Sequence, residues 1–143
     1  MIRIITCGKI KDTQLSTLSN EYLKRSNYLG KIELIELRNQ DVEEKIRRYK
    51  EEHTSEQIYL LAEEGKTFTS EEFAQLIKIL HEEQLTFIIG PAKGFSDELK
   101  QEFALFSLSP LTMMHELAQV VLLEQLYREV LLELVHASLS KEI

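Results

Sequence analysis

The sequence predicts an α/β domain in which a mostly parallel sheet of five or six strands is flanked by helices. Short runs rich in β-branched residues alternate with stretches whose apolar residues recur at helical spacing. Strand–helix alternation is typical of parallel strands joined by crossover helices. The 143 residues are 43% hydrophobic and 29% charged, which is ordinary for a folded chain, so we expect one domain over residues 1–143.

Five apolar runs are expected to form the strands. The run Leu85–Ile89 is almost entirely apolar, which is typical of a strand in a sheet covered on both faces. The five expected strands are Ile2–Thr6, Lys31–Leu37, Gln57–Ala62, Leu85–Ile89 and Ala104–Ser107.

The intervals between these runs have helical spacing. One stripe follows the i, i+3, i+4, i+7 pattern of an amphipathic helix and contains Phe73, Leu76, Ile77 and Leu80. Thr69 and Glu72 match a capping box at the start of this helix. Ser96 is expected to cap a short helix that ends by Phe103. Two earlier helices are expected around residues 15–23 and 42–49.

The last helix, expected over Glu116–Val135, has two apolar faces. The main stripe contains Val120, Leu123, Leu126, Tyr127, Val130, Leu131 and Leu134. The second patch contains Leu117, Val121, Leu132 and Val135. One face can pack on the sheet, and the other needs a further partner, which a homodimer would supply.

Composition excludes several classes of protein. The net charge of −7 argues against strong nonspecific nucleic-acid binding, although a local basic face remains compatible with it. No signal peptide or membrane span is visible, so we expect a cytoplasmic protein. Cys7 is the single cysteine and is interpreted as a buried small hydrophobe, the alternative being a reactive thiol. The four histidines lack metal-ligand spacing, so no metal site is expected.

Three loops should meet at the carboxyl ends of the strands, where open α/β sheets bind ligands. The loop 63–66 is polar, and the loop Gly90–Gly94 has the glycines that allow close approach to main chain. The loop 107–115 is small, apolar and hydroxyl-rich, and could hold an adenosine-like ligand. The alternatives are an ordinary strand-to-helix turn for Gly90–Gly94 and a partly buried connector for 107–115.

Three side chains on or beside the last helix are of types that can take part in chemistry. His115 stands at its start and could contact a substrate, or could be a helix-start residue without a role. Tyr127 lies on the main apolar stripe, which favours core packing, and Arg128 follows it at about 100° around the helix. No Ser/His/Asp arrangement or Cys/His pair stands out.

Seven segments in order over about residues 1–130 resemble the RlmH family of the SPOUT superfamily. Three of them are the loop Ser107-Leu-Ser-Pro-Leu-Thr-Met-Met-His115, the segment Leu60-Leu61-Ala62-Glu63-Glu64-Gly65-Lys66 and the helix motif Glu124-Gln125-Leu126-Tyr127-Arg128, and the motifs are specific only together. The opening Ile-Ile-Thr-Cys-Gly-Lys, the helix motif 21–25, the strand 35–37 and the segment 87–94 are similar to the family as well.

The resemblance implies a SPOUT α/β-knot fold with a C-terminal trefoil knot and a homodimer. It implies an S-adenosylmethionine-dependent enzyme that methylates N3 of a pseudouridine in large-subunit ribosomal RNA on assembled ribosomes. The expected catalytic residues are His115, which would face the substrate side and orient the base, and Arg128, which would contact a phosphate or the cofactor carboxylate. The cofactor would be bound by Leu61, Gly90, Pro91, Leu108, Ser109, Pro110, Leu111, Thr112, Met113 and Met114.

The chain departs from the family pattern at several positions. Pro91 replaces a second glycine, Gln119 replaces an arginine, and the chain lacks the family's C-terminal Pro-Tyr-His-Arg/Lys tail. The alternative function is therefore a catalytically weakened SPOUT-like dimer that binds a ligand or the ribosome without methyl transfer. An unrelated receiver or flavodoxin-like module is the third reading, and a receiver would need paired acids after the first strand, where Thr6-Cys7-Gly8 has none.

Overall fold

The computed structural model describes residues 1–28, 32–38, 40–79 and 83–142. In these ranges five strands form one sheet in the order β2-β1-β4-β3-β5, and all neighbours are parallel. The strands are β1 (Ile2–Cys7), β2 (Ile32–Leu37), β3 (Gln57–Thr67), β4 (Leu85–Ile89) and β5 (Ala104–Ser107). The helices are α1 (Thr13–Tyr28), α2 (Val42–Glu52), α3 (Ser70–Ile79), α4 (Asp97–Gln101) and α5 (His115–Glu142).

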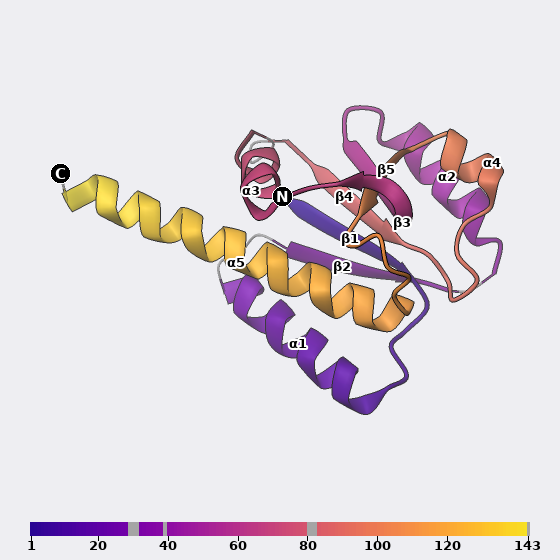
Figure 1. The fold of residues 1–143 in the computed structure, drawn as a ribbon, viewed down its shortest axis with the longest axis horizontal. Coiled ribbons are helices and arrows are strands. Elements are labelled where there is room, and N and C mark those ends of the chain that lie inside the picture. Colours follow the sequence, from indigo (N-terminus) through magenta and orange to yellow (C-terminus); the bar gives the residue numbers. More distant parts are fainter. Residues whose placement is uncertain (29–31, 39, 80–82, 143) are drawn as a thin grey trace.

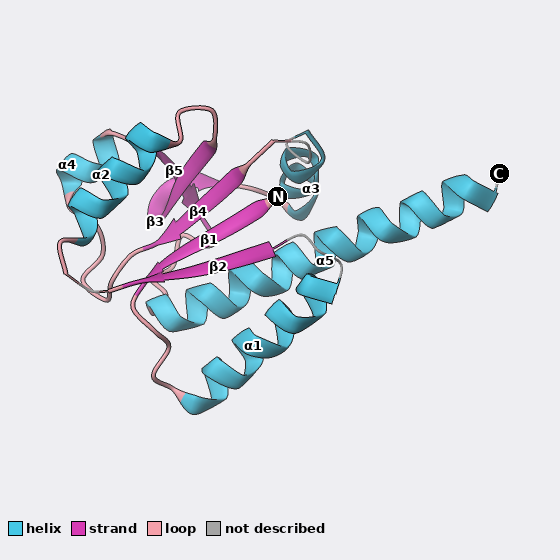
Figure 2. Ribbon diagram, turned by 180° about the vertical axis from the view of Figure 1, so that it is seen from behind, coloured by secondary structure: helices cyan, strands magenta, loops and turns pink. Residues whose placement is uncertain are grey.

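Helices cover both faces of the sheet, as the sequence predicts (Figure 1). Ile4 and Phe87 point to one face and pack with α3 and α5, whereas Ile5 and Ile88 point to the other face and pack with α2 and α4. Figure 2 shows α1 and α5 together on one side of the sheet and α2 and α4 on the other. The central strands are therefore apolar on both faces, and β4 is buried at all five positions.

Local sequence signals fixed the starts of two helices. The backbone N–H of Glu72 donates to Thr69 Oγ1 at 3.1 Å and Glu72 Oε1 accepts from the Thr69 backbone N–H at 2.9 Å, so the capping box is confirmed. Ser96 Oγ accepts from the Leu99 backbone N–H at 3.2 Å, which confirms the cap of α4. Lys31 and Leu80, where two predicted elements begin or end, lie outside the described residues.

Two elements are longer than the sequence predicts. The strand β3 continues to Thr67, because its polar residues 62–65 form a bulge and Lys66 and Thr67 then pair with β5 again. The helix α5 continues to Glu142, and its carboxyl-terminal half projects beyond the rest of the molecule (Figure 1).

The helix α1 packs on α5 through contacts to residues outside the second apolar patch. Gln119 of α5 is buried and donates to Ser19 Oγ of α1 at 2.9 Å, and the rings of Tyr22 and Tyr127 are 5.8 Å apart. Leu122, which the sequence analysis placed on neither apolar face, is fully buried. The second patch is still partly uncovered, since Leu117 and Leu132 are 38% and 46% exposed. The side chains of Val130, Leu134 and Val135 lie outside the described part of the chain.

Cys7 is buried, and burial raises the pKa of its thiol to about 12. It is therefore the inert small hydrophobe that the sequence favours. None of the described helices is long and apolar enough to span a lipid bilayer. In the described ranges, no three His, Cys, Asp or Glu side chains come together as they would around a metal ion. The trefoil knot stays a prediction.

Candidate ligand site

A cavity of about 280 Å³ lies at the carboxyl ends of β3, β4 and β5. The bulge within β3 and the segments that follow β4 and β5 form its walls, and the start of α5 closes one side. Its lining residues are Leu61, Ala62, Glu63, Glu64, Ile89, Gly90, Pro91, Ala92, Lys93, Gly94, Phe95, Lys100, Leu108, Ser109, Leu111, Thr112, Met113, His115 and Ala118. The three loops singled out in the sequence therefore meet at one site.

The Gly90–Gly94 loop brings main chain to the cavity wall. The Phe95 ring packs on Gly90 so closely that a Cβ at position 90 would lie 2.9 to 3.1 Å from three ring carbons. Gly94 has a φ of 77°, and its N–H donates to the Pro91 carbonyl at 2.8 Å, which closes the turn. Gly90 is thus required by the aromatic side chain that forms part of the wall.

The bulge in β3 carries two acidic side chains to the cavity. The register with β5 shifts between Leu61 and Lys66, both of which pair with Phe106. Gly65 makes this possible, because a Cβ there would lie 2.8 Å from the backbone of Leu105 and Phe106. Close backbone approach at a bulge is a position that only glycine fills without displacement.

The two acids brought by this bulge have different partners. Glu64 forms an ion pair with Lys100 at 2.6 Å, and this lysine holds the pKa of the Glu64 carboxyl below its usual range. Glu63 accepts a hydrogen bond from Thr112 Oγ1 on the opposite wall. The second contact ties β3 to the loop that precedes α5.

That loop is held largely by its own hydroxyl groups. Ser107 Oγ donates to the Ser109 carbonyl at 2.8 Å, and Ser109 Oγ accepts from the Leu111 backbone N–H at 3.1 Å. Leu111 and Met114 are 78% and 55% exposed. The loop is therefore an ordered wall with apolar side chains at its outer surface.

The start of α5 joins the cavity to the segment that follows β1. His115 lines the cavity, and its Nε2 lies 3.8 Å from Glu116 Oε2. Glu116 is buried, and its Oε1 accepts from the backbone N–H groups of Lys11 at 3.1 Å and Asp12 at 3.0 Å. An acidic residue in the first turn also suits the helix dipole.

The structure brings most of the predicted site residues together. Those that line the cavity are Leu61, Gly90, Pro91, Leu108, Ser109, Leu111, Thr112, Met113 and His115. Pro110 and Met114 belong to the same loop and are exposed, outside the lining. Arg128 is elsewhere: it is exposed and pairs with Glu124 at 2.5 Å. It follows His115 by 13 residues (128 − 115), which is roughly 20 Å along the helix.

Sequence reasoning missed several lining residues, among them Phe95, Lys100 and Ala118. Phe95 directly follows Gly94, so an aromatic residue next to the glycine-bearing loop was an available signal. Lys100 lies on α4 and reaches the site only because Glu64 is displaced by the bulge. No local sequence pattern reports that displacement.

A parallel α/β sheet with a main-chain and apolar cavity over its carboxyl edge defines the class of α/β domains that bind small organic ligands there. Within this class, a family model described as "Predicted SPOUT methyltransferase" matches residues 1–136. The chain belongs to the SPOUT methyltransferase family.

Relatives and a solved structure agree with this assignment. The chain is 36% identical over 145 residues to ribosomal RNA large subunit methyltransferase H of Enterococcus faecalis, covering 89% of this chain and 91% of the relative. It is 37% identical over 128 residues to the protein of the same name from Prochlorococcus marinus, covering 88% and 86%. A Bacillus anthracis crystal structure assigned as an RNA methyltransferase shares the fold, with a TM-score of 0.57, 11% identity and coverage of 90% and 93%.

Proposed function

We propose that this chain is an S-adenosylmethionine-dependent methyltransferase that acts on large-subunit ribosomal RNA. Relatives named ribosomal RNA large subunit methyltransferase H are more than 30% identical to this chain over most of both chains. The observation that supports the proposal most strongly is the cavity, whose lining joins segments up to 57 residues apart in sequence (118 − 61) and includes nine of the residues that the family resemblance implies. For the particular base, we propose N3 of a pseudouridine.

The lining of the cavity supports S-adenosylmethionine as the ligand. The cavity volume of about 280 Å³ is near the lower end of the range of small-molecule sites. Leu61, Leu108 and Ala118 offer apolar contacts to an adenosine, and the missing Cβ of Gly90 lets a ligand approach the main chain. Lys93 and Glu63 on the lining supply charges of both signs, which suits a zwitterionic amino acid group with a sulfonium.

The bound cofactor would supply an electrophilic methyl group for transfer. The chain itself contributes binding, orientation and exclusion of water, which are the principal means by which a protein speeds such a transfer. The loop Leu108–Met114 would hold the adenosine, and His115 at the cavity edge would orient the acceptor base. No strong general base is needed when the acceptor nitrogen loses its proton readily.

Arg128 is proposed as a contact to RNA phosphate or to the cofactor carboxylate. Its distance along α5 excludes a reach into the cavity of its own chain. The guanidinium would therefore contact either a phosphate of RNA that lies across the molecule or a cofactor carboxylate in the cavity of a second copy. The present ion pair with Glu124 is solvent-exposed and is easily exchanged.

The alternative is a dimer that binds a ligand or the ribosome without methyl transfer. The departures that motivate it are compatible with the observed packing. Pro91 still supplies the carbonyl that closes the turn, and Gln119 is buried against Ser19, so this position serves helix packing here. Both substitutions are thus accommodated by the fold, and the transfer assay separates the two functions.

We further propose that the chain is a homodimer that works in the cytoplasm, where ribosomes are found. The exposed Leu117 and Leu132 on α5 and the projecting end of this helix (Figure 2) support a second copy as its partner.

Two measurements test the function together. Calorimetry should detect S-adenosylmethionine binding, and a labelled methyl group should pass to ribosomes purified from cells that lack this gene. His115→Gln should lower methyl transfer at least tenfold while the cofactor affinity stays within about threefold. Absence of binding at millimolar cofactor would refute the proposal, and binding without transfer would establish the alternative.

A further inference from the structure

We propose that the segment between β1 and α1 contacts the phosphate backbone of the RNA substrate through the ammonium groups of Lys9 and Lys11. This inference rests on the proposed function, because it names the surface that holds the RNA beside the same cavity. We call residues 8–12 the lysine loop.

The lysine loop lies next to the cavity in the sheet. The strands β1 and β4 are parallel neighbours, and the last residues they pair are Thr6 and Ile89. The loops that follow them therefore leave the sheet at the same edge, and the loop after β4 is a wall of the cavity.

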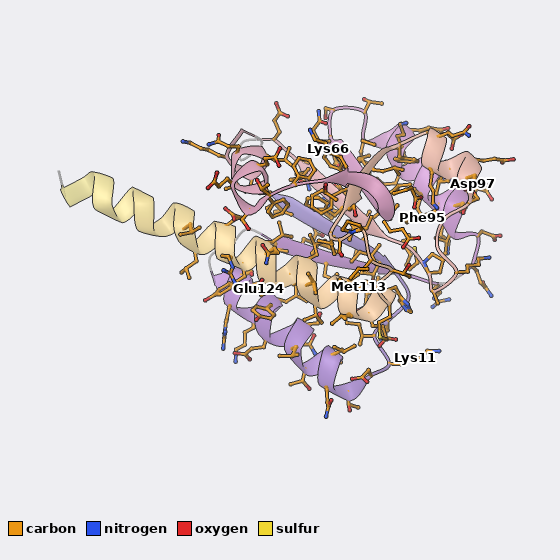
Figure 3. All side chains as sticks on the ribbon, viewed as in Figure 1. Lys11, Lys66, Phe95, Asp97, Met113 and Glu124 are labelled. Carbon is orange, nitrogen blue, oxygen red and sulfur yellow. The ribbon has the colours of Figure 1, made fainter. Side chains whose placement is uncertain are left out.

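Glu116 fixes the lysine loop to the rim of the cavity. Its buried carboxylate accepts the backbone N–H groups of Lys11 and Asp12, which are more than 100 residues away in sequence. The preceding residue, His115, lines the cavity. The main chain of the loop is thus anchored beside the residue that we place on the substrate side, while its lysine side chains point into solvent. Figure 3 shows Lys11 on this loop with its side chain directed away from the sheet.

The acids around the lysine loop are already used by backbone groups. Asp12 Oδ1 accepts the N–H groups of Gln14 and Leu15, both at 3.0 Å, and so caps α1. The Glu116 oxygen that faces the loop is taken up in the same way. Lys9 and Lys11 are exposed, and neither ammonium has an ion-pair partner among the described residues.

Lysine ammonium groups that have no ion-pair partner in the described part of the chain matter here because acids outnumber bases. Acids outnumber bases by 24 to 17, and the net charge is −7. RNA gains affinity where lysines displace its counterions, and an acidic surface gives it few such places. Lysine presents a mobile point charge, which suits phosphates without reading sequence. The RNA bases would then be selected at the cavity.

The test measures ribosome binding as a function of salt. Pelleting with ribosomes from cells that lack the gene gives a dissociation constant at several potassium chloride concentrations from about 50 to 200 mM. Each phosphate contact contributes roughly 0.7 to 0.9 to the slope of log affinity against log salt. We expect the double variant K9Q/K11Q to bind about tenfold more weakly at low salt and to lose about one to two from the slope. K9R/K11R should retain both values.

Lys24→Gln is the matched control, because Lys24 is exposed on α1 and lies about 13 residues from Lys11 in the sequence. This substitution changes the net charge by the same amount as K9Q or K11Q. Each of K9Q and K11Q should weaken binding more than K24Q does. An unchanged slope in K9Q/K11Q, or an equal loss in K24Q, would overturn the inference. Cofactor affinity measured by calorimetry should be the same in all variants. Absence of cofactor binding to the unmodified protein would instead refute the proposed function. The pelleting experiment would still show whether Lys9 and Lys11 contribute to ribosome binding.

Discussion

At the scale of single residues, the cavity depends on Gly90 and Phe95. The absent Cβ at position 90 is what lets the buried ring of Phe95 lie against the main chain. The ring therefore forms part of the wall, and the space beside it stays available to a ligand. A side chain at position 90 would push this ring, because the gap is smaller than ordinary contact distances.

Gly90→Ala should lower cofactor affinity about tenfold, since the displaced Phe95 ring narrows the cavity. The double variant G90A/F95A should bind more tightly than G90A, because the smaller side chain leaves room for the new Cβ. Calorimetry with S-adenosylmethionine gives both values, with F95A alone as the reference. Equal affinity of G90A and the unmodified protein would contradict the role given to this glycine.

The hydrogen bond between Thr112 and Glu63 is a second contact between single residues on which the cavity depends. It joins the two opposite walls of the cavity. Thr112→Val removes the hydroxyl donor at nearly constant volume and should weaken cofactor binding about fivefold, the effect of one lost hydrogen bond. Thr112→Ser keeps the donor and should bind as the unmodified protein does. The idea fails if the two variants bind alike.

At the scale of elements, the bulge of β3 shapes the site. Four residues leave the ladder between Leu61 and Lys66, and Gly65 presses on the backbone of β5. The bulge aims Glu63 at Thr112 and Glu64 at Lys100. A bulge next to a ligand site is a common way to redirect side chains.

Gly65→Ala should destabilise the protein by about 1–3 kcal/mol, because the new Cβ meets backbone that cannot move aside easily. Urea denaturation measures this loss. Thr67→Ala, at an exposed position of the same strand, is the control and should change stability by less than about 0.5 kcal/mol. If G65A were as stable as T67A, the backbone of β5 would move aside for the new Cβ at little cost, and the close approach at Gly65 would not require glycine.

Helices α2 and α4 are joined by a carboxylate that titrates in the acid range. Glu43 accepts from the Ser96 backbone N–H at 2.8 Å and from Ser96 Oγ at 2.5 Å. Burial raises the pKa of Glu43, but the two hydrogen bonds from Ser96 outweigh it and hold the pKa below its ordinary value of 4.5. The ionised carboxylate therefore stabilises the folded state above this value, and the contribution is lost as pH falls through the lowered pKa.

Glu43→Gln should accordingly reduce stability at neutral pH, and its difference from the unmodified protein should shrink at about pH 3. Urea titrations at the two pH values give the difference. Glu44→Gln removes the exposed pair with Arg48, which is worth little, and should leave stability nearly unchanged. A difference between E43Q and the unmodified protein that is constant with pH would exclude the linkage.

At the scale of the whole molecule, α5 is the least enclosed element. Its first half packs on the sheet through Leu122, Leu123 and Leu126 and on α1 through Gln119. Beyond this region Leu131 and Leu132 are exposed, and the helix projects from the body of the chain (Figure 1). A helix that leaves the body with exposed leucines is expected to find a partner.

Analytical ultracentrifugation should therefore give the mass of a dimer. The double variant L117S/L132S removes apolar contacts from the second patch and should raise the dimer dissociation constant at least tenfold. Leu18→Ser, at a similarly exposed leucine of α1, should leave the dimer intact. A monomeric unmodified protein at micromolar concentration would contradict the dimer.

The order of the elements, the two apolar faces of the sheet and the helix caps could all be predicted from the sequence. These follow from local physical rules: period 2 for the strands, period 3.6 for the helices, and side-chain bonds from Thr69, Glu72 and Ser96 to nearby N–H groups. The sequence also placed the three ligand loops at one edge, because parallel strands put all their carboxyl ends there. The family resemblance also named nine of the residues that line the cavity.

The features that depend on contacts between distant segments could not be predicted from the sequence and are seen in the folded structure alone. The bulge that brings Glu64 to Lys100 arises from pairing between β3 and β5, which no local pattern encodes. The burial of Gln119 follows from the way α1 packs on α5. Long-range register and helix packing are set by the summed fit of many side chains, so they become visible only in the folded molecule.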